Sequence, residues 1–347
     1  MIASLRSAGG LHAAPTLLFR SRTGTHYSYL AFLVSVLMLS AQAGIEGDGP
    51  PGQQVKQMAV ILQRGNLELC LMPEVGGSVK SLRFAGESVL RSASPEAIAA
   101  KAPLETAGFP LIPFSGRIAN GHFQWNGRDV ALKQNFLPEP HAIHGHGWAA
   151  VWSVDDSGTD HATLTYRHDA DDWPWSYLAR QTFQLRHDGL DLTLSLKNLS
   201  AATMPAGLGW HPYFPRQDAR IELPVSGIWR SDENMIPTEL TAPCGCSDLR
   251  RMRRVDDLVL DNAFATDPAR ARIEWPARGL SVEMVSDRIF SHVVVFTPPG
   301  QNFFCIEPVS HAPDAVNSRQ AASVTGLVSL PPDGELSGTI RLTVSKV

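Results

Sequence analysis

The stretch that decides the fold is Gly189–Lys197, which reads GLDLTLSLK. Every second residue from Leu190 to Leu196 is leucine, and the residues between them are polar or charged. Side chains on a β-strand alternate between the two faces of a sheet, so this pattern predicts a strand with one buried and one solvated face. The same alternation recurs near both ends of the chain, at residues 67–71 and 340–344.

Further short runs of the same kind follow one another, at residues 121–125, 162–166, 181–187, 219–223, 279–285, 291–297 and 302–306. Turn residues separate them, including Asn126-Gly127, Asp188-Gly189, Pro298-Pro299-Gly300 and Pro331–Gly334. Asn-Gly and Asp-Gly between alternating runs are hairpin signals. The best helix candidate is short, with Ser94 as N-cap and Pro95 at the first helical position. Many short strands with almost no helix predict an all-β fold, a large antiparallel sandwich or barrel.

The composition and net charge limit the classes of molecule that the protein is expected to bind. The 347 residues are 44% hydrophobic and 18% charged, which is typical of a folded globular protein. The net charge of −4 gives no basic field for nucleic acid. The arginines between residues 250 and 254 are followed at once by Asp256 and Asp257, which favours a solvated loop over a polyanion-binding patch.

The four cysteines do not form a disulfide framework. Cys70 and Cys305 lie in apolar runs and are expected to be buried thiols. Cys244 and Cys246 are too few for a structural zinc site, which needs four ligands.

Residues 1–57 differ from the rest of the chain. An apolar run at residues 29–39, too short to span a bilayer, precedes Ala41-Gln42-Ala43, which has the form of a signal-peptidase site. Two interpretations stay open: a secretory signal, or a gene start placed too early, with the natural chain beginning near Met58. The free thiols favour a cytoplasmic protein, with a periplasmic or secreted one as the alternative. We expect one catalytic domain over residues 58–347.

Residues 207–214, GLGWHPYF, place His211 between glycines and aromatic side chains, where a pocket could form. Glu307 follows an apolar run and precedes Pro308, which is expected to end the strand. Burying that carboxylate raises its pKa toward the range useful to a base. An arginine fork and a second carboxylate, Arg117 and Asp261, are suited to grip vicinal hydroxyls. A surface position for Glu307 and a purely structural role for His211 are the alternatives.

Three histidines lie in one short segment, residues 141–148, which reads HAIHGHGW. The spacing could supply two or three metal ligands, but no carboxylate completes the set, so we predict no metal site. In an extended segment His144 and His146 would share one face, with His141 on the other. The glycines beside them indicate a turn or a close approach of the backbone.

Five motifs in order resemble those of the aldose 1-epimerase (galactose mutarotase) family, from about residue 58 onward. They are Arg117 in R-I-x-x-G-x-F, His144 in H-G-x-G-W, His211 in G-W-H-P-Y-F, Asp261 in L-D-N-x-F and Glu307 in F-F-C-I-E-P. The family's fold is a large antiparallel β-sandwich, the galactose mutarotase-like supersandwich, which agrees with the strand pattern. The resemblance implies an isomerase that interconverts the α and β anomers of a free aldose such as galactose or glucose.

The resemblance also implies the roles. Glu307 would be the general base and His211 the general acid, with Arg117, His144 and Asp261 on the sugar hydroxyls. Trp210 or Trp148 could stack on the sugar ring. No cofactor is implied, and the expected partner is a small-molecule sugar bound by a monomer or homodimer, without nucleic acid or stable membrane insertion.

The chain departs from the family at two places. Gly116 stands where the family commonly has asparagine, and the segment at His144 reads His-Gly-His-Gly-Trp rather than His-Gly-Gly, as in a less-studied bacterial branch. A hexose-6-phosphate 1-epimerase and a non-catalytic sugar-binding protein are the alternatives. The first would need basic residues at the pocket mouth, for which Arg216, Arg128 and the 250–254 run are candidates. A glycosidase, which needs two opposed carboxylates, is less favoured.

Overall fold

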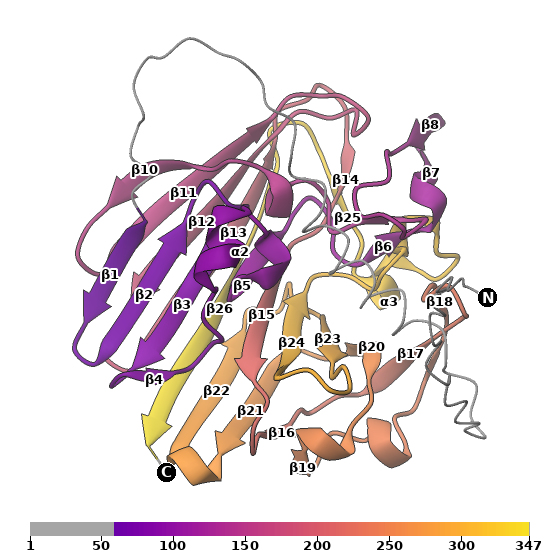
Figure 1. Cartoon of the computed structure of the whole chain (residues 1–347). Coiled ribbons are helices and arrows are strands. Elements are labelled where there is room, and N and C mark those ends of the chain that lie inside the picture. The colour runs from indigo at the N-terminus through magenta and orange to yellow at the C-terminus, as the bar shows by residue number, and fades with distance from the viewer. Residues whose placement is uncertain (1–58, 347) are drawn as a thin grey trace, which may run out of the picture.

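The computed structural model describes residues 59–346. The predicted leader, and with it the predicted boundary at residue 58, lies outside these described residues. Within them the strands form two large antiparallel sheets and three small ribbons (Figure 1). The all-β prediction is confirmed. No helix within residues 59–346 has the length and apolar character needed to cross a bilayer.

The first sheet has eleven strands. Their order is β1 (Val60–Arg64), β2 (Leu67–Met72), β3 (Ser78–Phe84), β5 (Gly108–Leu111), β15 (Gly209–Pro215), β24 (Phe303–Val309), β23 (His292–Phe296), β20 (Asp261–Ala265), β17 (Gly227–Ser231) and β18 (Pro237–Thr241), with β4 (Glu87–Ser88) paired to β3. Strands distant in the sequence, β5, β15 and β24, are therefore neighbours at its centre.

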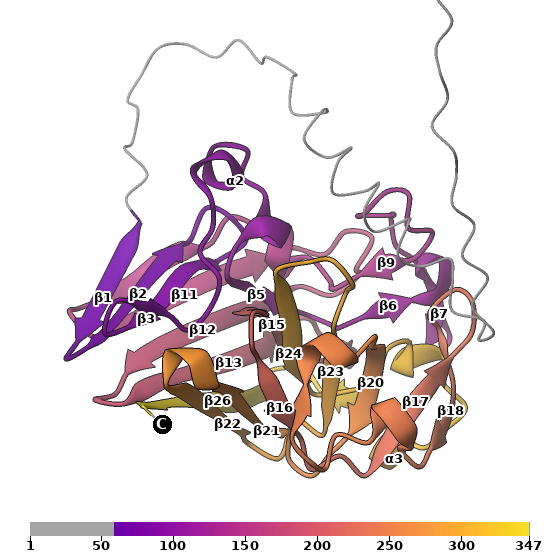
Figure 2. The same ribbon diagram turned by 60° about the horizontal axis from the view of Figure 1, so that its bottom comes forward.

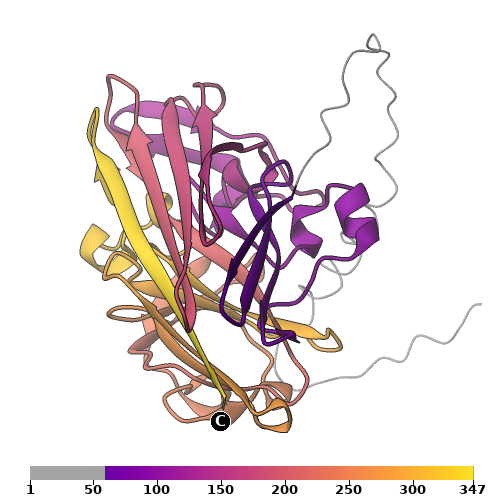
Figure 3. The same cartoon turned by 90° about the vertical axis from the view of Figure 1, so that its left-hand side faces the viewer.

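The second sheet has nine strands. Their order is β10 (Ser153–Ser157), β11 (His161–His168), β12 (Tyr177–Leu185), β13 (Gly189–Asn198), β26 (Glu335–Lys346), β22 (Leu280–Ser286), β21 (Arg270–Trp275), β16 (Arg220–Glu222) and β19 (Arg253–Arg254). Figure 3 shows the indigo N-terminal strands of the first sheet and yellow β26 of the second in separate layers.

Besides seven single-turn 3-10 helices, the described fold has three ribbons and two short α-helices. They are β14 (Met204–Ala206) with β25 (Val328–Leu330), β6 (Arg117–Ile118) with β9 (Ala142–Ile143), β7 (His122–Trp125) with β8 (Arg128–Ala131), α2 (Pro95–Ala99) and α3 (Ala322–Thr325). Ser94 caps α2 and Pro95 occupies its first turn, as predicted. Asn126 and Gly127, both at positive φ, join β7 to β8. Figure 2 shows β6, β7 and β9 beside β17 and β18.

The main core lies between the two sheets. The leucines of β13, from Leu190 to Leu196, are 0–1% exposed and belong to it, which confirms the alternation in the sequence. Each buried leucine contributes roughly 1.5–3 kcal/mol of transfer free energy. A second, smaller apolar cluster includes Phe109, Tyr213 and Cys305, and it occupies the other face of the first sheet. The candidate site is built on that second face.

Candidate active site

The register of two central strands places His211 beside Glu307. Strands β15 and β24 pair antiparallel, with Gly209 opposite Val309 and Tyr213 opposite Cys305. Midway between these pairs, His211 lies opposite Glu307. Directly opposed residues of an antiparallel pair project from the same face of the sheet, about 4.5–5.5 Å apart at Cβ. Two residues 96 positions apart thus become neighbours through register alone.

The two prolines next to this pair are part of the sheet. Pro308 was expected to end its strand, but β24 continues through it to Val309. Residues 210 to 212 of β15 form no ladder pairs with β24. On its other edge β15 stays paired with β5, with Pro212 opposite Gly108. A proline has no N–H to donate, so it fits where a ladder is interrupted. The interruption falls beside His211.

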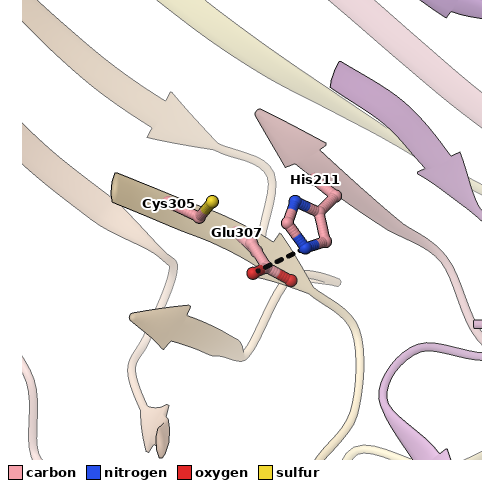
Figure 4. Close-up of side chains that lie close together, drawn as sticks. All are labelled: His211, Cys305 and Glu307. Carbon is pink, nitrogen blue, oxygen red and sulfur yellow. Dashed lines mark ion pairs between the residues drawn. The ribbon is translucent and has the colours of Figure 1, made fainter. Parts of the chain in front are cut away.

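The His211 Nε2 atom lies 3.3 Å from Glu307 Oε1, and Cys305 lies beside them on β24 (Figure 4). Both side chains are buried: His211 is 8% exposed and Glu307 is 3% exposed. The imidazole packs against the rings of Phe109 and Tyr213, each with its centroid 4.7 Å away. The pair is therefore buried and held by its neighbours, with the acid and the base close enough to exchange a proton.

Burial sets the protonation of the pair. It raises the pKa of Glu307 well above its ordinary value, helped by the Asp261 carboxylate and opposed by Arg117. It lowers the pKa of His211 well below its ordinary value, helped by the neighbouring His144 and Arg91. Both shifts favour the uncharged pair, in which Glu307 holds the proton. Moving that proton to His211 gives the ionised base and protonated acid without changing the net charge.

His144 faces the same pair from outside the sheet. Its main chain is left-handed, with φ of 60°, and its ring lies edge-on to His211 with centroids 5.6 Å apart. The Gly116 N–H donates to Nδ1 at 3.2 Å, so the neutral ring carries its proton on Nε2. Burial and Arg117 lower the pKa of His144 to about 3. His144 is thus a neutral hydrogen-bond donor at working pH.

Arg117 and Asp261 approach from two different elements. Arg117 lies on β6, and its Nε donates to Glu139 Oε1 at 3.2 Å. Asp261 begins β20, and burial raises the pKa of its carboxyl, while the Arg117 charge acts in the opposite direction. Each group has hydrogen-bonding capacity left for a ligand.

A cavity of about 240 Å³ brings these groups together. Its lining includes all five residues singled out in the sequence motifs: Arg117, His144, His211, Asp261 and Glu307. Its size suits a molecule smaller than a typical drug. Carboxylates, imidazoles and a guanidinium converging on a small cavity can bind hydroxyls and move protons between them.

Comparisons with known proteins identify the family. The aldose 1-epimerase family profile matches residues 58–343. The chain belongs to the aldose 1-epimerase family. It is 31% identical over 297 residues to the uncharacterized protein YphB of Escherichia coli (strain K12), covering 82% of this chain and 97% of that protein.

Solved structures agree with this assignment. A candidate aldose 1-epimerase of Escherichia coli K12 superposes with a TM-score of 0.76 at 29% identity, covering 84% of this chain and 99% of that one. A galactose mutarotase-like protein of Clostridium acetobutylicum gives a TM-score of 0.75 at 21% identity, covering 83% and 95%, and shows the common fold.

In this member of the family, neither tryptophan proposed for sugar stacking lines the cavity. Trp210 is fully buried in the core between the sheets, because neighbouring strand residues point to opposite faces and His211 occupies the cavity side. Trp148 is 6% exposed and packs against Phe109 and Phe136. The structure gives the predicted stacking no surface in this cavity.

The histidine segment is not extended as expected. The left-handed φ of His144 and Gly145 breaks the alternation, so His141 and His144 both line the cavity while His146 does not. His146 instead stacks on the ring of His168, with centroids 4.5 Å apart, and its Nε2 lies 3.5 Å from Asp172.

Two sets of ligand-type side chains lie close together within residues 59–346. One potential ligand atom from each of His211, Cys305 and Glu307 lies within 4.8 Å of the other two. The same holds for His146, Asp171 and Asp172. Each set offers three groups, of which two already pair with each other. We assign none of them as metal ligands.

Sequence reasoning missed several lining residues. Glu139 and Glu233 add two carboxylates to the cavity, and His141 bonds through Nε2 to the carbonyl of Asn234. These residues lie in loops without a periodic pattern. The proximity of Glu139 to the histidine segment was the one available signal.

Proposed function

We propose that the protein is a mutarotase that interconverts the α and β anomers of a free, uncharged aldose such as galactose or glucose. The observation that carries this proposal is the buried pair of His211 and Glu307, 3.3 Å apart, in a cavity that Arg117, His144 and Asp261 also line. One acid and one base side by side are what ring opening requires.

In the proposed reaction, Glu307 in its ionised form takes the proton from the C1 hydroxyl. The C1–O5 bond breaks as His211 gives its proton to the ring oxygen, which leaves an open-chain aldehyde. Rotation about C1–C2 presents the other face of the carbonyl. Ring closure then returns both protons by the reverse steps, with acid and base exchanging roles.

The remaining cavity groups hold the sugar. His144 presents a neutral Nε2–H, which can donate to an oxygen without adding charge. Arg117 donates and Asp261 accepts, a combination that suits vicinal hydroxyls. Hydroxyl donors on the Glu307 carboxylate also favour its ionised form, which supports the proton shift within the resting pair.

The charge of the cavity supports an uncharged substrate over a hexose 6-phosphate. Among residues 59–346, Arg117 is the one arginine or lysine in its lining, and it is paired with Glu139. Arg216 bonds to the carbonyls of Val255 and Pro298, Arg128 lies over Trp175, and neither they nor the 250–254 run line the cavity.

The test is polarimetry of freshly dissolved α-D-galactose and α-D-glucose. Wild type should speed the decay of optical rotation, and Glu307→Gln should lower kcat by about 10²–10⁴. Glu283→Gln, which removes an exposed carboxylate on β22, is the matched control and should retain full activity. Wild type no faster than buffer on free aldoses would overturn the proposal. Catalysis of glucose 6-phosphate alone would support the phosphosugar alternative, and binding without catalysis the sugar-binding protein.

A further inference from the structure

The ring of Tyr213 connects the candidate acid to a cation outside the cavity. Tyr213 is two residues from His211 on β15, on the same face, and the two rings stack at 4.7 Å with an interplanar angle of 26°. Tyr213 is 1% exposed and does not line the cavity. Tyr213 can therefore influence a ligand only indirectly, and His211 is the cavity residue on which its ring stacks.

Arg91 lies against that tyrosine ring. Its Cζ is 3.5 Å from the Tyr213 centroid, and it also approaches the ring of Phe303 at 4.7 Å. Its Nε donates to the carbonyl of Thr106 at 2.6 Å, and an Nη donates to that of Leu104. These bonds fix the guanidinium plane, and a cation over an aromatic face is attracted to it.

This arginine has no carboxylate partner within ion-pair distance among residues 59–346. Its polar contacts are two main-chain carbonyls and the ring and hydroxyl of Tyr213. Burial lowers its pKa, while the more distant Glu105 carboxylate acts in the opposite direction. A partly buried cation without a counter-ion costs free energy. A buried ionisable group with a perturbed pKa is a candidate for a functional role.

The charge of Arg91 acts on His211. Because the Arg91 Cζ and the His211 ring are 3.5 and 4.7 Å from the same Tyr213 centroid, they lie at most about 8 Å apart. The other ionisable groups near the imidazole are Glu307 on β24, Cys305 beside it, Tyr213 on β15 and His144 from the segment after β9. Arg91 is the permanent cation among them, and it disfavours a second positive charge on the imidazole.

We propose that Arg91 is a positioning residue for His211: it holds the Tyr213 ring against the imidazole and places a fixed cation behind it, so that His211 releases its proton readily. The kinetic consequence rests on the mutarotase function proposed above. The expected change in the His211 pKa does not depend on that function, so the two proposals can be refuted separately.

The experiment compares Arg91→Gln with Arg278→Gln. Glutamine keeps a donor for the carbonyls but has no charge. Arg278 is the matched control, because its Cζ also lies over an aromatic ring, that of Trp275 at 5.2 Å, and it bonds to the carbonyl of Ser88. The readout is the titration of the His211 ring by NMR, with the resonance assigned through its loss in His211→Asn.

Arg91→Gln should raise the His211 pKa by about one unit, and Arg278→Gln should leave it in place. The acid limb of the kcat/KM profile should move to higher pH by the same amount. An unchanged His211 titration in folded Arg91→Gln would overturn the proposal, whether or not the protein is a mutarotase.

If Arg91→Gln does not fold, Arg91→Lys decides. Lysine keeps the charge but lacks the fork that bonds two carbonyls at once. The Tyr213 ring would be held less firmly, so kcat should fall about tenfold with KM and the pH profile unchanged. A lysine variant with the kcat of wild type would contradict the positioning role.

Discussion

The burial of Glu307 predicts that its removal stabilises the protein, and increasingly so as the pH rises. The folded-state pKa of Glu307 is raised above that of the unfolded chain, so the folded state holds its proton more tightly. The stability that this proton contributes is fully present below the unfolded pKa, about 4.3, and is lost as the pH rises through the folded pKa. Between these two pKa values, each unit of pH lowers the free energy of unfolding of wild type by up to about 1.4 kcal/mol.

Glu307→Gln has a similar shape and no charge at any pH. Its free energy of unfolding should lie near that of wild type at pH 4 and exceed it by an amount that grows up to about 1.4 kcal/mol per pH unit, until the folded pKa is passed. The lowered pKa of His211 works in the opposite sense, with stability lost as the pH falls below about 6.5, but this residue is present in both proteins.

The assay is urea unfolding, followed by tryptophan fluorescence, at half-unit steps from pH 4 to pH 8. Glu283→Gln, which removes an exposed carboxylate in the second sheet, is the control. Parallel stability curves for wild type and Glu307→Gln would refute the reasoning, because a carboxylate that ionises in the fold as it does in the unfolded chain is not desolvated.

Three further outcomes are expected. His211→Asn and Glu307→Gln should each lower kcat by about 10²–10⁴. The double variant should have a kcat no lower than that of the less active single variant. If polarimetry shows that the two losses multiply, the two residues do not act as a unit. Trp210→Phe should lower the free energy of unfolding by about 1–2 kcal/mol and leave KM unchanged, and a raised KM with full stability would place this ring on the substrate. Gly145→Ala should lower both Tm and kcat. Its Cβ would lie 2.2 Å from the Ile112 carbonyl oxygen, and the φ of 71° at this position is strained for alanine. A Tm equal to that of wild type would contradict this.

The strands were predictable because they carry local signals. Leucine on every second position of β13 and Asn126-Gly127 between β7 and β8 depend on a few neighbouring residues, and both appear where the pattern places them. The end of β24 was not predictable, because whether a proline fits in a strand depends on which neighbour its nitrogen faces. That information lies in the pairing of Pro308, not in the residues around it.

The candidate site was also predictable only in part. The motifs indicated His211 and Glu307, but only the register of two strands brings them face to face. The exclusion of Trp210 from the cavity was available from the sequence, since a residue next to His211 on a strand must face away from it. The position of His144 could not be predicted from the sequence, because its left-handed main chain follows from contacts with residues far away in the sequence.

The two faces of the first sheet explain how the protein tolerates a buried acid and base. One face packs on the second sheet and supplies most of the apolar burial, through side chains such as Trp210 and Phe304. The opposite face is then free to carry groups that are costly to bury. His211 Nδ1 has no hydrogen-bond partner among the described residues, and Glu307 is held against its preferred ionisation. A sugar hydroxyl that donates to the Glu307 carboxylate relieves the second cost, so the carboxylate that weakens the empty fold is the group that a polyol would satisfy.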